Sequence, residues 1–257
     1  MWSQCVCPSL SRGLAKAAAT GGNALLQSGT AVTYRYAIYA APAPGSALAR
    51  HAAAWLGRDA LTDLPRAQPL PQTMPITREA DRYGFHGTLK PPFQLAEGRD
   101  EAALLDALAA YAARTAPVDL GPLSVQDLSG FIALRPVVSP PALAALAADV
   151  VEAFDGFRRP PDAAELARRR VHGLTPAQEA NLARWGYPYV MDEFRLHFTL
   201  TSRLPAAERA PLIAWLQRYF DPALSAPFIL DTLWLFVEPA PGAPFRQVAG
   251  FALAGKS

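Results

Sequence analysis

The sequence contains little cysteine: Cys5 and Cys7 are its two cysteines in 257 residues. Both lie within the first seven positions, so no disulfide framework can hold the rest of the chain together. The same scarcity excludes a cysteine cluster of the kind that binds structural zinc. This cysteine usage is typical of a reducing compartment, and we expect a cytoplasmic location.

The sequence also lacks a long apolar run and a large excess of one charge. No run is long enough to cross a bilayer, so we expect no membrane-spanning segment. The net charge of +2 does not require a long nucleic acid as partner, although a small anion needs only a local basic patch. With 51% hydrophobic and 18% charged residues, the chain is typical of a globular protein.

Two regions differ in character. Residues 1–33 are rich in Ser, Gly and Ala, show no periodicity and lack the pattern of a secretory signal, so we expect a loosely ordered extension. Residues 34–257 are expected to form one domain. Apolar periodicity and helix or turn signals predict strands over 34–40, 82–90, 118–126, 130–135, 194–202, 228–237 and 245–253. They predict helices over 46–56 (with Ser46 as N-cap), 100–115, 140–154, two within 161–184, and 205–220, with a proline-rich loop over 64–75.

A repeated word stands out in this pattern. His86-Gly87-Thr88-Leu89 and His197-Phe198-Thr199-Leu200 both read His-x-Thr-Leu, and the two histidines are 111 residues apart. Each word is followed by a helix and then by strands. The repeat predicts an α+β fold of two lobes related by a pseudo-twofold, each with an antiparallel sheet and helices, and with a cleft between them.

The two His-x-Thr motifs place side chains that can act on a substrate on one face of each strand. Residues two apart share a face, so His86, Thr88 and Lys90 are expected together, as are His197 and Thr199 with Arg195, Thr201 and Arg203. Two imidazoles suit a phosphodiester, because one can accept the proton of the attacking oxygen while the other protonates the leaving oxygen. Thr88, Thr199 and Lys90 are the expected phosphate-binding residues.

The alternative is that the histidines are structural, which is the usual role of a single histidine in a strand. With Thr at roughly 1 in 20 positions and Leu at roughly 1 in 10, two chance matches among four histidines are on the order of 1 in 10,000. His51 and His172 have no such context and are interpreted as surface residues. No H-x-x-x-H word is present, so neither a metal nor a cofactor is expected.

These words, together with RYAIYAAP at 35–42, YGFHGTLKPPF at 83–93 and RWGYPYVMDEFRLHFTLTSRL at 184–204, resemble the two-histidine (2H) phosphoesterase superfamily. The extended words are similar to a subgroup described as a putative phosphonate metabolism protein, found beside carbon–phosphorus bond-cleavage genes. The resemblance covers roughly residues 34–253. It implies a metal-independent phosphodiesterase in which His86 and His197 are acid and base and Thr88 and Thr199 bind phosphate.

The same resemblance implies a small cyclic phosphodiester as substrate, such as a sugar cyclic phosphate of phosphonate breakdown. Alternatives are a 2′,5′-RNA or nucleoside 2′,3′-cyclic phosphodiesterase, a module that binds RNA ends or nucleotides, and a non-catalytic subunit of a phosphonate-degrading assembly. Tyr187 and Arg195 are further candidates for substrate binding. Arg168 to Arg170 suit a solvated helix face or a lid that meets an anion. The sequence leaves open the substrate, the acid and base assignment and the oligomeric state.

Overall fold

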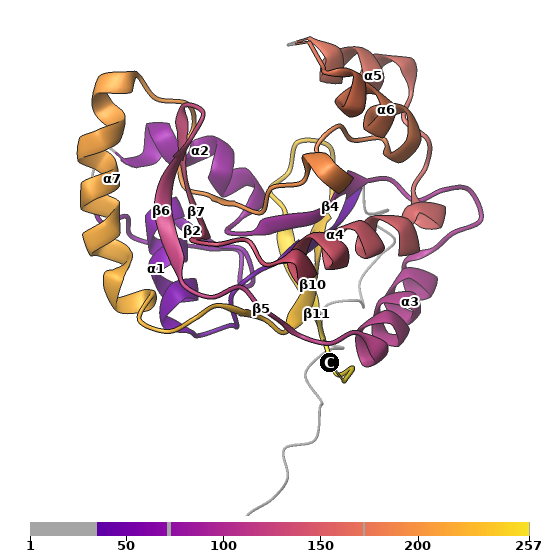
Figure 1. The fold of residues 1–257 in the computed structure, drawn as a ribbon, viewed down its shortest axis with the longest axis horizontal. Helices are drawn as coiled ribbons and strands as arrows, with labels where there is room; N and C mark the ends of the chain where they lie inside the picture. The colour runs from indigo at the N-terminus through magenta and orange to yellow at the C-terminus, as the bar shows by residue number, and fades with distance from the viewer. Residues whose placement is uncertain (1–34, 71–72, 172, 257) are drawn as a thin grey trace, which may run out of the picture. The chain divides into compact units, whose positions relative to one another are not determined.

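The computed structural model describes residues 35–70, 73–171 and 173–256 (Figure 1). The predicted extension at 1–33 and His172 therefore lie outside the described residues. The elements, in chain order, are β1 (Arg35–Ala40), α1 (Ala47–Leu56), β2 (Arg58–Asp59), β3 (Leu64–Pro65), α2 (Thr73–Tyr83), β4 (Gly87–Phe93), α3 (Glu101–Arg114), β5 (Val118–Asp119), β6 (Leu123–Leu128), β7 (Phe131–Pro136), α4 (Pro141–Ala153), η1 (Asp155–Phe157), α5 (Ala163–Arg170), α6 (Pro176–Trp185), η2 (Met191–Glu193), β8 (Phe198–Thr199), α7 (Ala206–Phe220), η3 (Asp221–Ala223), β9 (Ile229–Leu230), β10 (Thr232–Glu238) and β11 (Arg246–Ala252).

Seven of these strands form one antiparallel sheet in the order β11-β10-β1-β4-β8-β7-β6. The predicted mixture of helices with antiparallel strands is thus confirmed. The expectation of a separate sheet in each lobe is wrong, because β4 and β8 hydrogen-bond to each other and join the strands into one ladder. Two short pairs, β2 with β3 and β5 with β9, lie outside this sheet.

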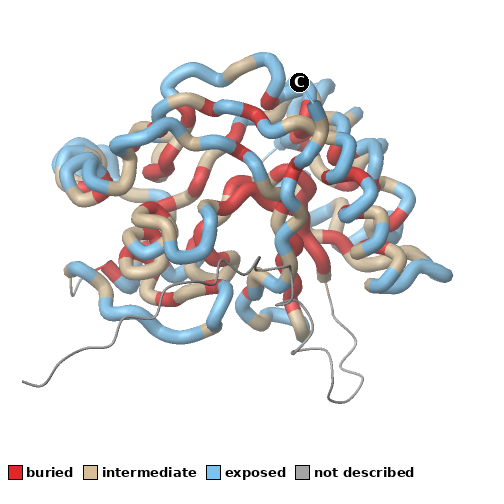
Figure 2. Tube along the Cα trace, turned by 90° about the horizontal axis from the view of Figure 1, so that it is seen from below, coloured by how far each residue is buried: buried red, intermediate tan, exposed pale blue. Residues whose placement is uncertain are grey.

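The sheet is buried between helices and loops. α7 packs against β6 and β7, α4 against β4, and α3 against β10 and β11. Figure 2 shows buried residues gathered along the central strands and exposed ones on the outer segments. In β1, Ile38 enters the main core while the next residue, Tyr39, enters a second cluster with Phe236 and Phe245. Both faces of β1 are therefore buried, which explains its nearly continuous apolar sequence.

Local signals account for several helix ends. Ser46 caps α1 as predicted, since its Oγ accepts a hydrogen bond from the Ala49 backbone N at 3.1 Å. α1 ends at Gly57, whose φ of 94° is a left-handed conformation that glycine adopts without steric cost. Among the described residues, no helix combines the length and hydrophobicity that a bilayer crossing requires.

Five of the predicted segments differ from the structure. The strand expected over 118–126 is divided into β5 and β6, and the strand expected over 228–237 into β9 and β10. α2 begins inside the segment predicted as a loop, because Pro75 is the third residue of the helix and proline is tolerated in the first turn. The same helix continues to Tyr83, so β4 starts later than predicted, and it runs through Pro91 and Pro92 instead of ending before them. The strand expected over 194–202 is reduced to the two residues of β8.

Candidate active site

The two His-x-Thr words meet on neighbouring central strands. Gly87 of β4 pairs with Phe198 of β8. Extending this antiparallel register by one residue in each direction places His86 opposite Thr199 and Thr88 opposite His197. Each histidine therefore faces the threonine of the other word across the strand pair. Two motifs that are distant in sequence form a single polar site on one sheet.

The backbone orients both imidazoles in the same way. Nδ1 of His86 lies 2.9 Å from the carbonyl oxygen of Gly84, and Nδ1 of His197 lies 2.8 Å from that of Arg195. In each case the carbonyl belongs to the residue two positions earlier. A carbonyl can only accept a hydrogen bond, so each Nδ1 carries the hydrogen and each Nε2 remains for a substrate.

The surroundings of the two rings favour the neutral imidazole. Burial lowers the pKa of His86 to about 4, with a further lowering by His197 and an opposing effect of the hydrogen bond to Gly84. Burial likewise lowers the pKa of His197, the bond to Arg195 opposes this, and Arg135 lowers it further. The ring of Tyr39 stacks on His86 with centroids 3.8 Å apart, which contributes to that burial. Near pH 7 both rings are neutral and each Nε2 can accept a proton.

Two hollows open beside the strand pair. One, of about 490 Å³, is lined by Thr88 and His197, by aromatic residues of three segments and by two arginines. The other, of about 550 Å³, is lined by Thr199, Thr201 and Ser202. The hollows share Phe131 and Arg203 in their linings. The hydroxyls of Thr88 and Thr199 thus border space that a small ligand can enter.

Two predicted substrate residues lie at the first hollow. Tyr187 lines it, and its ring packs at 76° against Tyr189, with centroids 5.6 Å apart. The guanidinium of Arg169 lies 4.6 Å from the centroid of the Tyr187 ring. Arg195 also lines the hollow but is exposed, and its Nη1 donates to the carbonyls of Asp192 (2.8 Å) and Phe194 (2.6 Å). Its guanidinium is thus turned back onto its own loop at the rim.

Lys90 does not share the face of His86 and Thr88, which corrects the prediction. The pairing of β4 with β1 shifts at this point, so Thr88 lies opposite Tyr39 while Lys90 lies opposite Ile38, the adjacent residue of β1. This bulge at Leu89 turns Lys90 to the other face of the sheet. There its Nζ donates to the carbonyl of Val151 in α4 at 3.0 Å. The structure therefore separates Lys90 from the two threonines.

Arg135 is a candidate site residue that the sequence did not single out. Ala133 pairs with Thr199 and Leu134 with Phe198, so Arg135 comes next in the register, opposite His197. Its Nη1 donates to Oε1 of Gln126 at 3.2 Å, and its Nε is buried without a partner among the described residues. The alternation of β7 puts Arg135 on one face with Phe131. Only the pairing of β7 with β8 places that face beside His197, and a single sequence does not give this pairing.

Within the described parts of the chain, no group of three or more His, Cys, Asp or Glu residues is placed to hold a metal ion. The groups that line the two hollows are imidazole, hydroxyl, phenol and guanidinium, together with the carboxylates of Glu193 and Glu79.

The chain belongs to the family described as Protein of unknown function (DUF1045), whose model matches residues 88–246. It is 43% identical over 216 residues to a protein of Laribacter hongkongensis (strain HLHK9) named Ribose 1,5-bisphosphate phosphokinase PhnN, covering 82% of this chain and 50% of that protein. A protein of the same name from Janthinobacterium sp. (strain Marseille) is 38% identical over 233 residues, covering 86% of this chain and 51% of that one. The chain thus spans about half the length of these curated relatives.

A solved structure titled "Crystal structure of phosphoesterase" aligns with a TM-score of 0.38 at 14% sequence identity, covering 86% of this chain and 98% of that one.

The kinase name of the relatives directs attention to one further word. Residues 250–257 read G-F-A-L-A-G-K-S, which matches the G-x-x-x-x-G-K-[ST] pattern of nucleotide-binding loops. Such a loop lies between a strand and a helix, with its backbone N–H groups free for phosphate. Here the N–H groups of Leu253, Ala254 and Gly255 donate to the carbonyls of Asp231, Ala112 and Thr115 at 2.7–3.0 Å. Gly250 itself lies within β11. In this structure residues 253–255 of this motif hydrogen-bond to neighbouring segments through their backbone N–H groups.

Proposed function

We propose that this chain is a phosphodiesterase that opens a small cyclic phosphodiester by two-histidine acid/base catalysis. The observation that carries the proposal is the pair of imidazoles at the start of the adjacent strands β4 and β8. Each ring is held by a hydrogen bond from its Nδ1 to the backbone carbonyl two residues earlier, which leaves Nε2 for the substrate. A pseudo-twofold between the two words, passing near Gly87 and Phe198, is part of the proposal, and so is the origin of the fold as two related lobes.

In the proposed reaction His86 is the base and His197 the acid. The pKa of His86, lowered to about 4, keeps its Nε2 free to take a proton from water as the water oxygen attacks phosphorus. The negative charge of the bound phosphodiester favours a proton on Nε2 of His197, which then passes to the sugar oxygen as its bond to phosphorus breaks. The products are a phosphomonoester and a free hydroxyl, and the proton gained by His86 returns to solvent.

The other residues act on the phosphate. The hydroxyls of Thr88 and Thr199 donate to non-bridging oxygens, one beside each histidine. The guanidinium of Arg135, next to His197 in the register, offsets charge that develops on these oxygens. Because imidazole performs both proton transfers, we propose that the reaction needs no metal.

The names of the relatives suggest the substrate. Opening a 1,2-cyclic phosphate on ribose 5-phosphate at the bond to O2 gives ribose 1,5-bisphosphate, the compound in the name of the relatives. Arg195 and Arg203 at the first hollow provide cations for a second phosphate on such a sugar. We therefore propose a phosphorylated ribose with a cyclic phosphodiester as the substrate class, in phosphonate metabolism and in the cytoplasm.

The test is turnover in the presence of EDTA, with His86→Ala/His197→Ala as the matched inactive control. The panel contains ribose 1,2-cyclic phosphate with and without a 5-phosphate, nucleoside 2′,3′-cyclic phosphates and a short 2′,5′-linked RNA. We expect the wild type alone to turn over the phosphorylated ribose compound fastest. If a nucleoside or RNA compound is turned over fastest, the substrate class is that compound's and not a phosphorylated ribose. Equal turnover by the double variant, or tight binding with no turnover of any compound, would overturn the catalytic proposal in favour of a binding module.

A further inference from the structure

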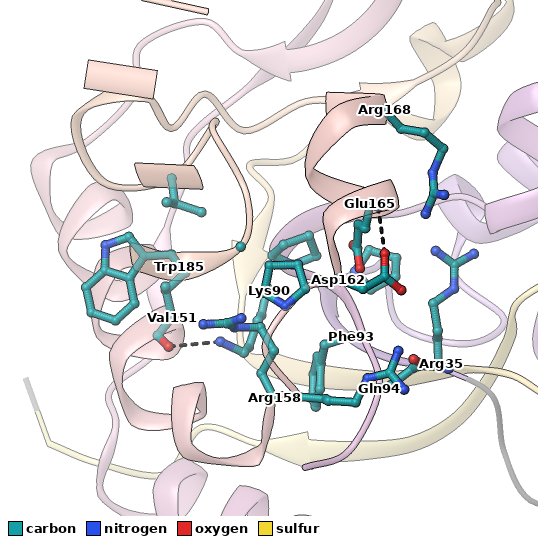
Figure 3. Close-up of a pocket in the computed structure, with 16 residues that line it drawn as sticks. Arg35, Lys90, Phe93, Gln94, Val151, Arg158, Asp162, Glu165, Arg168 and Trp185 are labelled. Carbon is teal, nitrogen blue, oxygen red and sulfur yellow. Dashed lines mark hydrogen bonds between the residues drawn. The ribbon is translucent and has the colours of Figure 1, made fainter. Parts of the chain in front are cut away.

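A third, smaller cavity of about 80 Å³ is lined by Lys90 and the residues that follow it in β4, next to the end of α4 and the start of α5. Figure 3 shows the side chains around it. Pro91 and Val190 line both this cavity and the first hollow of the candidate active site. Its charged lining is mostly basic, with the carboxylates Asp162 and Glu165 against the cations Arg35, Lys90, Arg158, Arg159 and Arg168.

Lys90 brings a buried cation to this cavity. Its side chain is 2% exposed, and it makes one hydrogen bond, to the carbonyl of Val151. Asp155 lies 3.6 Å from its Nζ as an ion-pair partner. An ammonium group has three hydrogens to donate, so among the described residues these two oxygen partners leave one hydrogen for a third acceptor. The ring of Phe93, with its centroid 5.7 Å from Nζ, adds a cation–π contact but no oxygen acceptor. A buried charged donor without its full set of acceptors is costly, and this cost points to a ligand.

Arg158 brings a second cation to the same place. Its Nε and Nη2 donate to Asp155 at 2.8 and 3.3 Å, and Nη2 also reaches the carbonyl of Arg184. Its Nη1 is buried and has no partner among the described residues. Figure 3 shows its guanidinium beside the amine of Lys90. One carboxylate, Asp155, therefore serves two neighbouring cations, and one positive charge of this trio is uncompensated.

Burial and the neighbouring charges both act on the pKa of Lys90. Burial lowers its pKa to about 8, Asp155 opposes this, and Arg158 lowers the pKa further. Water in the cavity would satisfy the free donors but would not neutralise the charge. A water molecule occupies about 30 Å³ in the liquid, so the cavity also has room for more than one water. A tetrahedral oxyanion both fits that space and provides the missing acceptors and charge.

We infer that this cavity binds a phosphate-type oxyanion between Nζ of Lys90 and Nη1 of Arg158, with the exposed Arg168 at its edge. The site is separate from the two histidines and does not depend on their chemistry. Free phosphate and the phosphoryl group of a sugar phosphate present the same oxygens to these donors. A ligand here meets the strand and loop residues that also line the active-site hollow, Pro91 and Val190.

The test is thermal unfolding of the full chain in increasing inorganic phosphate at constant ionic strength. A ligand that binds the folded state at a tenfold excess over its Kd raises Tm by about 3–6 °C for a chain of this size. We expect this rise in the wild type, in His86→Ala/His197→Ala and in the control Arg218→Gln, an exposed arginine of α7. We expect it to be lost in Lys90→Met and in Arg158→Gln.

The variants separate this site from the catalytic one. A rise that persists in both Lys90→Met and Arg158→Gln, or that is absent from the wild type, overturns the inference. A rise lost only in the double histidine variant assigns phosphate to the active site and overturns it as well. If Lys90→Met does not fold, Arg158→Gln alone decides. Repeating the titration with ribose 5-phosphate distinguishes the source, since a rise at lower concentration than with inorganic phosphate identifies an organic phosphate as the ligand.

Discussion

Gly87 of β4 lies directly opposite Phe198 of β8, so the middle residues of the two His-x-Thr words pair with each other. A Cβ on Gly87 would lie 2.7 Å from Cδ1 of Leu196 and 3.3 Å from Cε1 of Phe198. Glycine at this position therefore leaves room for the side chains of Leu196 and Phe198, which flank His197 on the opposing strand. The missing side chain of one word makes room for the phenyl ring of the other.

Gly87→Ala should consequently damage the site through packing. We expect it to cost about 1–3 kcal/mol of unfolding free energy, because the added methyl overpacks a filled contact. We also expect a lower kcat, because the side chains of Leu196 and Phe198, on either side of His197, must shift. Urea unfolding and steady-state kinetics measure the two effects. Gly156→Ala is the matched control, since its Cβ would meet nothing closer than 3.9 Å. Unchanged stability and activity in Gly87→Ala would contradict the close-approach argument.

The assignment of His86 as base and His197 as acid can be tested by changing the leaving group of the substrate. His86→Ala and His197→Ala should each lower kcat/KM on a sugar diester by about 10²–10⁴, the usual contribution of general acid or base catalysis. An activated aryl leaving group departs without a proton, so on such a diester His197→Ala should recover most of its loss while His86→Ala does not. His51→Asn, a histidine of α1, serves as the control and should keep wild-type rates. Recovery in His86→Ala instead would exchange the two roles.

Much of the fold follows from local sequence. The segment 46–56 contains both a capping serine and an apolar face, and the segments 100–115, 140–154 and 205–220 are long enough for periodicity to identify helices. The start of α2 was missed because the prolines of 64–75 predicted a loop, although Pro75 lies in the first turn of the helix, where it removes no required hydrogen bond. Here the position of the proline, which composition does not show, decides the outcome.

The site was predictable only in part, because strand pairing is a long-range property. Alternation along one strand placed Thr88 beside His86, but it also placed Lys90 there, and the bulge at Leu89 reverses the alternation before Lys90 is reached. Arg135, in contrast, was not predicted as a site residue, because nothing in the sequence of its own strand indicates such a role. Its place next to His197 comes from the register of β7 with β8.

Arg135 itself gives the next prediction. Arg135→Gln should lower kcat/KM by roughly tenfold to a hundredfold, since charge-assisted hydrogen bonds contribute about 1.5–3 kcal/mol. It should also raise the pKa of His197, because Arg135 is one of the causes that lower it. Kinetics and an NMR titration of the His197 ring measure the two changes. Arg135→Lys keeps the charge, so its kcat/KM and its His197 pKa should lie between those of the wild type and of Arg135→Gln. The control Arg114→Gln, at an exposed position, should change neither quantity. A loss of activity without a pKa change would indicate that Arg135 acts on the substrate alone.

The pH dependence of stability tests the burial of His86. Its folded-state pKa of about 4 lies below the ordinary value of 6.5, so between these values the unfolded chain binds the proton more readily than the folded one. This contribution to stability is therefore complete above pH 6.5 and is lost as pH falls towards 4. The difference is at most about 3 kcal/mol, because each pKa unit corresponds to about 1.36 kcal/mol and part of the ring is open to solvent.

His86→Gln removes the titrating group and should flatten this part of the profile. Urea unfolding of the wild type and the variant at half-unit steps from pH 7 to pH 4 gives the two curves. The wild type should lose unfolding free energy faster than the variant as the pH falls. The difference between the two curves should develop between pH 6.5 and pH 4. Parallel curves would mean that His86 titrates near its ordinary pKa. In that case burial beneath the stacked ring of Tyr39 would not lower the pKa of His86, and the assignment of His86 as the base would rest on the position of its ring alone.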